Sequence, residues 1–234
     1  MAGLPVFIRP AILVVGMGKD WRQEVLDWFF PRRCGLCARL GDRAVCDECL
    51  AAFPSAPSGF DLQRLGGAVD DLVTPYAFEG RASQAVRRLK YERVTSLADP
   101  MAEILAKSFE EEGLGYCDLI VPVPVSRQRR FERGFNQSEM LLAALPPDKV
   151  VAAALSRVRH TKPQVGLTAA ERMKNLVGAF EGEPKLLKGR SVLLVDDVVT
   201  TGGTALACGQ ELKRCGASRV TVLAFCGGRI EDGA

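Results

Sequence analysis

Two hydrophobic periods alternate along the C-terminal two thirds of the chain. Short, continuously apolar runs predict buried strands at 72–78, 118–125, 150–155, 192–195 and 219–225. Between them, apolar residues recur every three or four positions and predict helices at 83–91, 97–112, 136–145 and 204–215. Apolar strands that alternate with helices are typical of a parallel sheet covered on both faces. The pattern therefore predicts an α/β fold.

The composition narrows the class of protein. Hydrophobic residues make up 47% of the 234 residues and charged residues 25%, which is typical of a globular chain and excludes extended disorder. The formal net charge of +3 is too small to mark the whole chain as a nucleic-acid binder, so such a role would depend on local clusters. The apolar run at 11–17 is too short to cross a bilayer and matches a secretory signal poorly. We therefore expect a cytoplasmic protein.

Cysteine and loop-forming residues divide the chain. Four of the eight cysteines fall between positions 34 and 49, and residues 53–67 are rich in Pro, Ser and Gly. We expect an N-terminal extension of unknown order at 1–20, a cysteine module at 21–55, a linker at 56–70 and the α/β body at 71–228.

The cysteine module has the spacing of a metal site. Cys34, Cys37, Cys46 and Cys49 form two C-x2-C pairs separated by eight residues. Two such thiolate pairs complete a tetrahedron around one Zn²⁺ ion, and a site with four protein ligands is structural and not catalytic. A disulfide or free thiols are the alternatives, and a reducing compartment and the clustering disfavour them. The module is also too small to bury a core of its own.

The segment 192–204 carries the strongest candidate chemistry. An apolar strand ends in Asp196 and Asp197, and a turn with two glycines and three threonines leads into a helix. Glycine lets the backbone approach an anion, and a helix N-terminus offers unpaired N–H groups, so this turn predicts a phosphate site. The two carboxylates would repel phosphate, but they suit sugar hydroxyls or a hydrated metal ion. A glycine-rich turn with an aspartate cap is the plainer alternative.

Three segments concentrate positive charge. Arg127, Arg129, Arg130 and Arg133 lie in a loop expected after the predicted strand at 118–125 and suit diphosphate or a nucleic-acid backbone, because guanidinium groups make paired bonds to phosphate. A solvated charged loop is the plainer alternative. The segment 157–174, which includes Lys162, predicts a basic flap that closes over a ligand. A third run, between 81 and 93, is interpreted as a solvated helix face.

The loop at 196–204 resembles the phosphoribosyl-diphosphate motif of type I phosphoribosyltransferases. Further motifs resemble the ComF family of competence-related proteins: FPRRCGLC at 30–37, YAFEG at 76–80, LKY at 89–91, VPVP at 121–124 and RGFNQ at 133–137. The resemblance implies a type I phosphoribosyltransferase-like domain joined to a zinc-binding segment. It implies that Asp196 and Asp197 meet the ribose hydroxyls and that Mg²⁺ accompanies the diphosphate. It also implies that the 5-phosphate is wrapped by Val198, Val199, Thr200, Thr201, Gly202, Gly203 and Thr204.

Two functional hypotheses follow. In the first, the protein binds phosphoribosyl diphosphate, and a nitrogen nucleophile displaces diphosphate from ribose C1. Arg127 and the flap would stabilise the leaving group, with Arg133 and Lys162 among the ligand-binding residues. In the second, the protein is a single-stranded DNA-binding factor of DNA uptake in natural transformation, and its transferase-like site is regulatory or vestigial. The acceptor and the oligomeric state cannot be read from the sequence.

Overall fold

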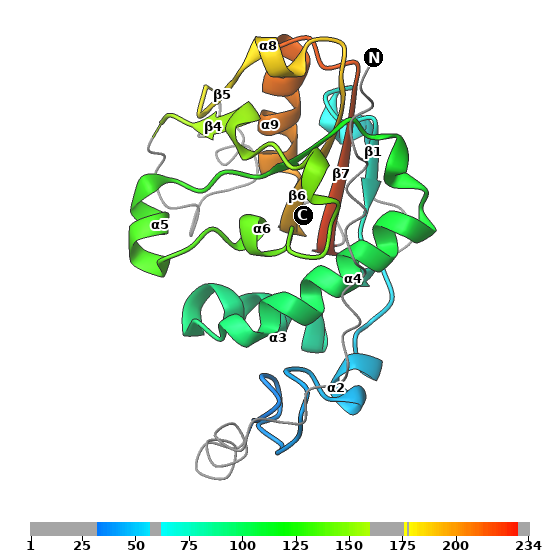
Figure 1. Ribbon diagram of the computed structural model, residues 1–234, viewed down its shortest axis with the longest axis vertical. Coiled ribbons are helices and arrows are strands. Elements are labelled where there is room, and N and C mark those ends of the chain that lie inside the picture. The colour runs from blue at the N-terminus through cyan, green and yellow to red at the C-terminus, as the bar shows by residue number, and fades with distance from the viewer. Residues whose placement is uncertain (1–31, 57–61, 160–175, 177, 229–234) are drawn as a thin grey trace, which may run out of the picture.

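A parallel sheet forms the centre of the computed structural model, which describes residues 32–56, 62–159, 176 and 178–228. Its strands follow the order β1 (Asp71–Val73), β7 (Arg219–Gly227), β6 (Ser191–Val199) and β3 (Leu119–Pro122), and β2 (Tyr76–Ala77) also pairs with β7. All of these pairings are parallel, and β6 and β7 lie side by side at the centre (Figure 1). The predicted α/β class is confirmed.

Side chains of β6 alternate between two hydrophobic cores. Leu193 and Val195 pack in the core that includes residues of α3 (Gly80–Arg87) and α4 (Ala98–Glu111). Val192 and Leu194 pack in the core that includes residues of α9 (Gly203–Arg214). This period-two alternation is the reason that the strand reads as continuously apolar, since both of its faces are buried. Helices cover both faces, as predicted.

Gly209 allows α9 to approach the backbone beneath it. A Cβ atom at this position would lie 2.5 Å from the carbonyl oxygen of Ala68. Leu65, Ala68 and Val69 are buried in the same core, although they fall within the range expected to be a linker. The chain therefore packs closely against α9 just before β1 begins.

Several predicted elements have different bounds in the structure. The strand expected at 192–195 continues to Val199 because its last residues pair with Cys226 and Gly227 of β7. The strand expected at 150–155 was wrong, since a 3-10 turn occupies Ala152–Ala154 and the short strand β4 (Leu155–Arg157) pairs with β5 (Phe180–Gly182) outside the central sheet. The helix expected at 136–145 is only one turn long, α6 (Gln137–Met140).

The remaining described elements are short connections. A π-helix, η2 (Arg88–Glu92), extends α3, and α8 (Pro184–Leu187) follows β5. Further 3-10 turns are η1 (Leu62–Leu65), η3 (Thr95–Leu97), η4 (Leu114–Tyr116) and η5 (Pro147–Lys149). In the part of the chain that is described, no helix has the length and apolar character needed to span a membrane.

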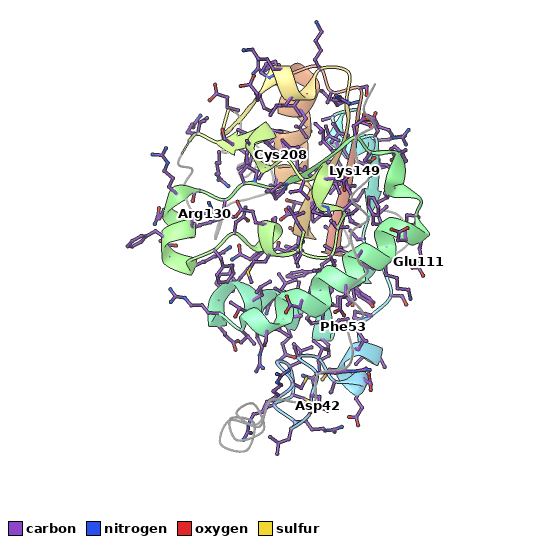
Figure 2. The ribbon with its side chains drawn as sticks, in the orientation of Figure 1. Asp42, Phe53, Glu111, Arg130, Lys149 and Cys208 are labelled. Atoms are coloured by element: carbon purple, nitrogen blue, oxygen red, sulfur yellow. The ribbon has the colours of Figure 1, made fainter. Side chains whose placement is uncertain are left out.

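The cysteine-rich segment packs beside the body through an aromatic cluster. Phe53 follows α2 (Asp47–Ala51) and lies between the N-terminal loop that carries Asp42 and the helices of the body (Figure 2). Its ring centroid lies 5.0 Å from that of Tyr76 and 5.7 Å from that of Phe225, and both contacts are edge-to-face. Such pairs stabilise a packed interface beyond the area that they bury.

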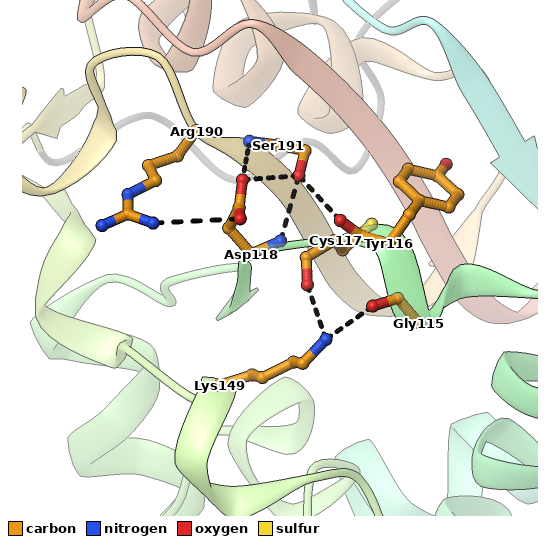
Figure 3. A network of polar contacts seen from close by, with 7 residues as sticks. All are labelled: Gly115, Tyr116, Cys117, Asp118, Lys149, Arg190 and Ser191. Atoms are coloured by element: carbon orange, nitrogen blue, oxygen red, sulfur yellow. Dashed lines mark hydrogen bonds and ion pairs between the residues drawn. The ribbon is translucent and has the colours of Figure 1, made fainter.

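Polar contacts join β3 and β6 where the two strands begin. Asp118 accepts hydrogen bonds from the Ser191 backbone at 2.8 Å and its hydroxyl at 2.7 Å, and Arg190 lies 3.8 Å away (Figure 3). Lys149 donates to the carbonyl oxygens of Gly115 and Cys117 nearby. These contacts hold the two strands in register at the end of the sheet opposite to the candidate site.

Candidate functional site

A cavity of about 800 Å³ opens at the carboxyl end of β3 and β6. In open parallel sheets this edge is where ligands bind, because the connections to the following helices leave a crevice there. A second, smaller cavity of about 40 Å³ adjoins it and is lined by the turn between β6 and α9. Asp196, Val198, Thr200 and Thr204 line both cavities, which makes them parts of one site.

Asp196 and Asp197 lie within β6 and not after it. Neighbouring side chains of a strand point to opposite faces, so the two carboxylates have different partners. Asp197 is 3% exposed, and its Oδ1 lies 2.8 Å from the Lys90 ammonium. Asp196 Oδ1 accepts hydrogen bonds from the Ser138 hydroxyl at 3.0 Å and from the backbone N–H of Asp197 at 2.9 Å. Both residues line the larger cavity.

The pKa of Asp196 departs from the usual range of an aspartate. Burial, followed by repulsion from Asp197, raises the pKa of Asp196 to about 7. The Lys90 ammonium and the two hydrogen bonds to Asp196 act in the opposite direction without cancelling this effect. Since the Asp197 carboxylate is paired with an ammonium group, the site holds one ion-paired carboxylate beside one that takes up a proton near neutral pH.

The turn after β6 has the backbone of an anion site. Gly202 adopts a left-handed conformation with φ of 75° at the N-cap of α9, a conformation that side chains other than glycine rarely accept. Helix α9 is 12 residues long, and its first backbone N–H groups have no partners within the helix. They face the small cavity together with the threonines of the turn, so a phosphate group there would meet both donors and the positive end of the helix dipole.

The opposite wall comes from the segment after β3. The arginine-rich segment, expected to be a loop, forms the helix α5 (Arg127–Arg133), which is capped by the Ser126 hydroxyl. Asn136 is 2% exposed and ties this wall to the sheet: its amide donates to the Val123 carbonyl oxygen, and its Oδ1 caps α6. The cap places Ser138 against Asp196, which explains the local role of the RGFNQ motif.

Positive charge predominates on the lining of the larger cavity. Among the described residues, five cationic ones line it against the three anionic residues Asp196, Asp197 and Glu132. The cations are Lys90, Arg93, Arg129, Arg133 and Arg157. Burial, and then the charge of Arg129, lowers the pKa of both Arg133 and Arg157, as expected for guanidinium groups held close together. A ligand with several negative charges would relieve this repulsion.

The structure places the predicted site residues unevenly. The residues from Asp196 to Thr204 come together at the two cavities, with Val199 buried beneath the turn. Arg133 lines the larger cavity. Arg127 is exposed at the start of α5 and is not among the lining residues, where Arg129 takes its place. Lys162 and nearly all of the predicted flap lie outside the described residues.

Sequence reasoning missed three lining residues of different kinds. Lys90 belongs to a basic run that was interpreted as a solvated face, yet it forms an ion pair with Asp197. Its position next to the apolar Leu89 in the LKY motif was the available signal. Tyr91 belongs to the same motif, which by itself indicated no role for the ring, and Ser138 carried no local signal. Both residues line the cavity in the folded chain.

The four clustered cysteines meet in space, as their spacing predicts. Their sulfur atoms all lie within 4.8 Å of one another, and Cys37 Sγ lies 3.7 Å from Cys46 Sγ. Tetrahedral coordination with Zn–S bonds of about 2.3 Å separates the sulfurs by about 3.8 Å, so the donor set fits a metal ion. Burial opposes ionisation of Cys34, but backbone N–H bonds from Cys46, Cys37 and Leu36 lower its pKa to about 6. A low pKa favours the thiolate form that binds metal.

Comparison with known proteins agrees with this arrangement. A family model described as the phosphoribosyl transferase domain matches residues 98–233. The DNA utilization protein YhgH of Salmonella typhimurium is 36% identical over 204 residues, which cover 82% of this chain and 89% of the relative. Competence protein F of Haemophilus influenzae is 35% identical over 222 residues, which cover 83% of this chain and 96% of the relative. The chain belongs to the ComF family.

Among solved structures, glutamine phosphoribosylpyrophosphate amidotransferase of Bacillus subtilis matches with a TM-score of 0.37 and 17% identity. The match covers 56% of this chain and 26% of that one. The cysteine cluster lies outside the phosphoribosyl transferase domain match, which begins at α4, so this ComF family chain joins a candidate metal site to that domain.

Proposed function

We propose that this protein binds phosphoribosyl diphosphate and transfers its phosphoribosyl group to a nitrogen acceptor. One observation carries the proposal: two carboxylates and a helix N-terminus behind a glycine turn share one cavity at the carboxyl end of β6. A phosphate donor site beside an acceptor site for a diol matches the two ends of ribose 5-phosphate. Membership of a family with a phosphoribosyl transferase domain supports the same assignment.

Each part of the ligand has a partner of suitable chemistry. The 5-phosphate would lie at the turn from Thr200 to Thr204, and the ribose hydroxyls would donate to Asp196 and to Asp197 Oδ2. Lys90 already holds Asp197 Oδ1, so it would fix this carboxylate for the sugar. The diphosphate would lie toward Arg129 and Arg133, which line the wall across from β6. Mg²⁺ would bind with the diphosphate and offset its charge.

The cavity would then favour departure of diphosphate. The bond between C1 and the diphosphate oxygen breaks, and its electron pair leaves with the diphosphate. The acceptor nitrogen forms the new bond to C1 and releases its proton to water. The guanidinium groups of Arg129 and Arg133 would stabilise the charge that develops on the leaving group, which is the usual large contribution of such sites.

Titration calorimetry with phosphoribosyl diphosphate and Mg²⁺ tests the proposal. We expect measurable binding, and Thr204→Val should weaken it because the hydroxyl at the phosphate turn is lost. Thr95→Val is the matched control, since Thr95 is exposed on η3 away from the cavity lining. Absence of binding by the unmodified protein, or equal losses in the two variants, would contradict the proposal.

We propose Zn²⁺ as the ion of the cysteine cluster and the reducing cytoplasm as its compartment, because four thiolates suit Zn²⁺ and must stay reduced. The purified protein should contain one Zn²⁺ per chain by atomic absorption. Cys49→Ser should lose most of it, whereas Cys208→Ala, which removes a buried thiol outside the cluster, should keep it. Equal zinc content in both variants would exclude this site.

A second candidate function is binding of single-stranded DNA by α5. Phe131 on this helix is 91% exposed, and Arg127 is exposed beside it. Exposed aromatic rings stack on bases, and cations beside them attract the backbone. We expect binding that weakens steeply with salt and falls when Phe131→Ala and Arg127→Ala are combined. Leu186→Ala, an exposed apolar position on α8, is the control. No binding at low salt would remove this candidate.

A further inference from the structure

Tyr91 is an exposed aromatic residue on the wall of the larger cavity. The residue is 71% exposed, although the two residues before it are held in place: Leu89 is fully buried and Lys90 reaches Asp197. Tyr91, Lys90 and Asp197 line the same cavity, so a ligand that Asp197 holds would share this space with the Tyr91 ring. Single exposed aromatics are common on surfaces, but this one is held by its neighbours on the cavity wall.

The backbone around Tyr91 is irregular in two ways. The residue lies in the π-helix η2, and the helix is followed by Arg93 in a left-handed conformation with φ of 56°. π-Helical turns occur frequently at functional sites, and a left-handed arginine costs free energy that surrounding contacts must offset. Arg93 donates a hydrogen bond to the Glu132 carbonyl oxygen of α5, which fastens the segment across the cavity.

A layer of polar groups supports the Tyr91 ring. The Arg133 guanidinium carbon lies over the ring, 5.4 Å from its centroid. Arg133 Nη1 donates to Gln137 Oε1 at 2.8 Å, so the guanidinium group is fixed from the other side. Gln137 is 1% exposed and lines the cavity. The ring is therefore held in place while much of it stays accessible.

The same layer contains a donor without an acceptor. Gln137 Nε2 is buried and has no hydrogen-bond partner in the described structure. Buried polar groups are almost always paired, so an unpaired amide on a cavity wall indicates that a polar atom of a ligand completes the site. This observation is independent of the exposure of Tyr91, and both residues contact Arg133.

We propose that Tyr91, held by Arg133 and Gln137, is the platform on which the acceptor ring stacks, and that the acceptor is therefore a planar aromatic nitrogen heterocycle and not an open-chain amine. The inference rests on the proposed function, because it places the ring on ribose C1. Stacking on an aromatic side chain tolerates any ring with an open π-face, so it defines the class of acceptor without selecting one base. Tyr91 is then a specificity-determining residue of the transfer.

Titration calorimetry with product-like ligands tests this inference. Adenosine 5′-monophosphate and uridine 5′-monophosphate carry a ring on C1, and ribose 5-phosphate lacks it. We expect at least one of the two nucleotides to bind roughly tenfold or more tightly than ribose 5-phosphate. Tyr91→Ala should remove this advantage while the affinity for ribose 5-phosphate stays unchanged. Tyr91→Phe keeps the ring and should retain the advantage.

Tyr116 provides a matched control. It is also a partly exposed tyrosine under an arginine, with the Arg219 guanidinium 5.3 Å from its ring centroid, but it is not among the residues that line the cavity. Tyr116→Ala should leave all three affinities unchanged. If ribose 5-phosphate binds and neither nucleotide binds more tightly, or if Tyr91→Ala weakens all ligands equally, the inference is wrong and the proposed function stands. If ribose 5-phosphate does not bind, the proposed function fails and the inference with it.

Discussion

The carboxylates at the two ends of the central sheet have pKa values that are shifted in opposite directions. At the amino end of β6, Asp118 accepts hydrogen bonds from the backbone and hydroxyl of Ser191, which lower its pKa, the backbone N–H being the larger cause. At the carboxyl end, burial and a neighbouring carboxylate raise the pKa of Asp196 to about 7. The end of the sheet where β3 and β6 begin therefore carries a carboxylate that its donors keep ionised, and the end where β6 finishes carries another that its surroundings partly protonate.

The difference distinguishes a structural carboxylate from a candidate ligand-binding one. Donors from the protein already surround Asp118, and it joins two strands without facing a large cavity. Asp196 and Asp197 lie together beside a cavity of about 800 Å³, which places two carboxylates where repulsion disfavours the ionised form of one of them. Such an arrangement costs stability, so its presence at a ligand-binding edge is an argument for function.

The largest expected effect is on ligand affinity, which should depend on the carboxylate at one end of the sheet and not on the carboxylate at the other. Asp197→Asn should weaken binding of phosphoribosyl diphosphate by about 10- to 100-fold, since hydrogen bonds to a charged acceptor contribute about 1.5–3 kcal/mol. Asp118→Asn should leave this affinity unchanged, because Asp118 lies at the opposite end of β6. Calorimetry at pH 8 measures both, with circular dichroism to show that each variant is folded. Equal affinities in the two variants would remove the functional distinction between the ends.

The next effect concerns stability and pH. The raised pKa of Asp196 means that the folded state binds a proton that the unfolded state has released, so this group's contribution is full below about pH 4 and is lost as pH rises through about 7. Asp196→Asn keeps an acceptor for Ser138 and removes the buried charge. It should therefore become increasingly more stable than the unmodified protein between pH 5 and pH 8.

Urea unfolding at pH 5, 6, 7 and 8 measures this difference. Asp99→Asn, an exposed aspartate in the first turn of α4, is the control and should not reproduce the trend. Parallel pH profiles for Asp196→Asn and the unmodified protein would show that Asp196 is ionised throughout this range.

The sequence predicted this sheet and the edge that carries the candidate site because both depend on local patterns. Residues 192–195 are apolar on both faces, which is the condition for a central parallel strand, and Gly202 allows the left-handed turn before α9. The cysteine cluster could also be predicted from the sequence, since two C-x2-C pairs bring four sulfurs together within a short segment. In each case the relevant residues are close in the chain.

The parts that were not predicted depend on distant contacts. Lys90 meets Asp197 across more than one hundred positions, and the charge pattern of the basic run between 81 and 93 does not distinguish it from solvated neighbours. Arg127 and Arg129 could not be ranked, because their orientation depends on whether the segment is a loop or the helix α5. The predicted end of the strand at Val195 was wrong. Two polar residues interrupt the apolar run there, but backbone pairing with β7 continues beyond them.

A smaller effect is expected at the amino end of β6. The lowered pKa of Asp118 adds stability that is present above about pH 4 and is lost as pH falls through the folded value. At pH 7, Asp118→Asn should therefore have a lower urea midpoint than the unmodified protein. As the pH falls toward 3, the urea midpoint of Asp118→Asn should decrease less than that of the unmodified protein. The stability that Asp118 contributes thus increases with pH, whereas the stability that Asp196 contributes decreases with pH. A midpoint difference that is independent of pH between 3 and 7 would contradict the assignment.

The smallest expected effect is on the urea midpoint, and it shows whether the short hydrogen bonds of Asp118 or its longer ion pair contribute more to stability. Arg190 lies 3.8 Å from Asp118 Oδ1, and both side chains are exposed, so solvent and salt screen the attraction. Arg190→Ala should change the urea midpoint slightly at 10 mM salt and not measurably at 0.5 M. Ser191→Ala, which removes a hydroxyl 2.7 Å from Asp118, should lower the midpoint at both salt concentrations. If Arg190→Ala had the larger effect at 10 mM salt, charge attraction and not hydrogen bonding would keep Asp118 ionised.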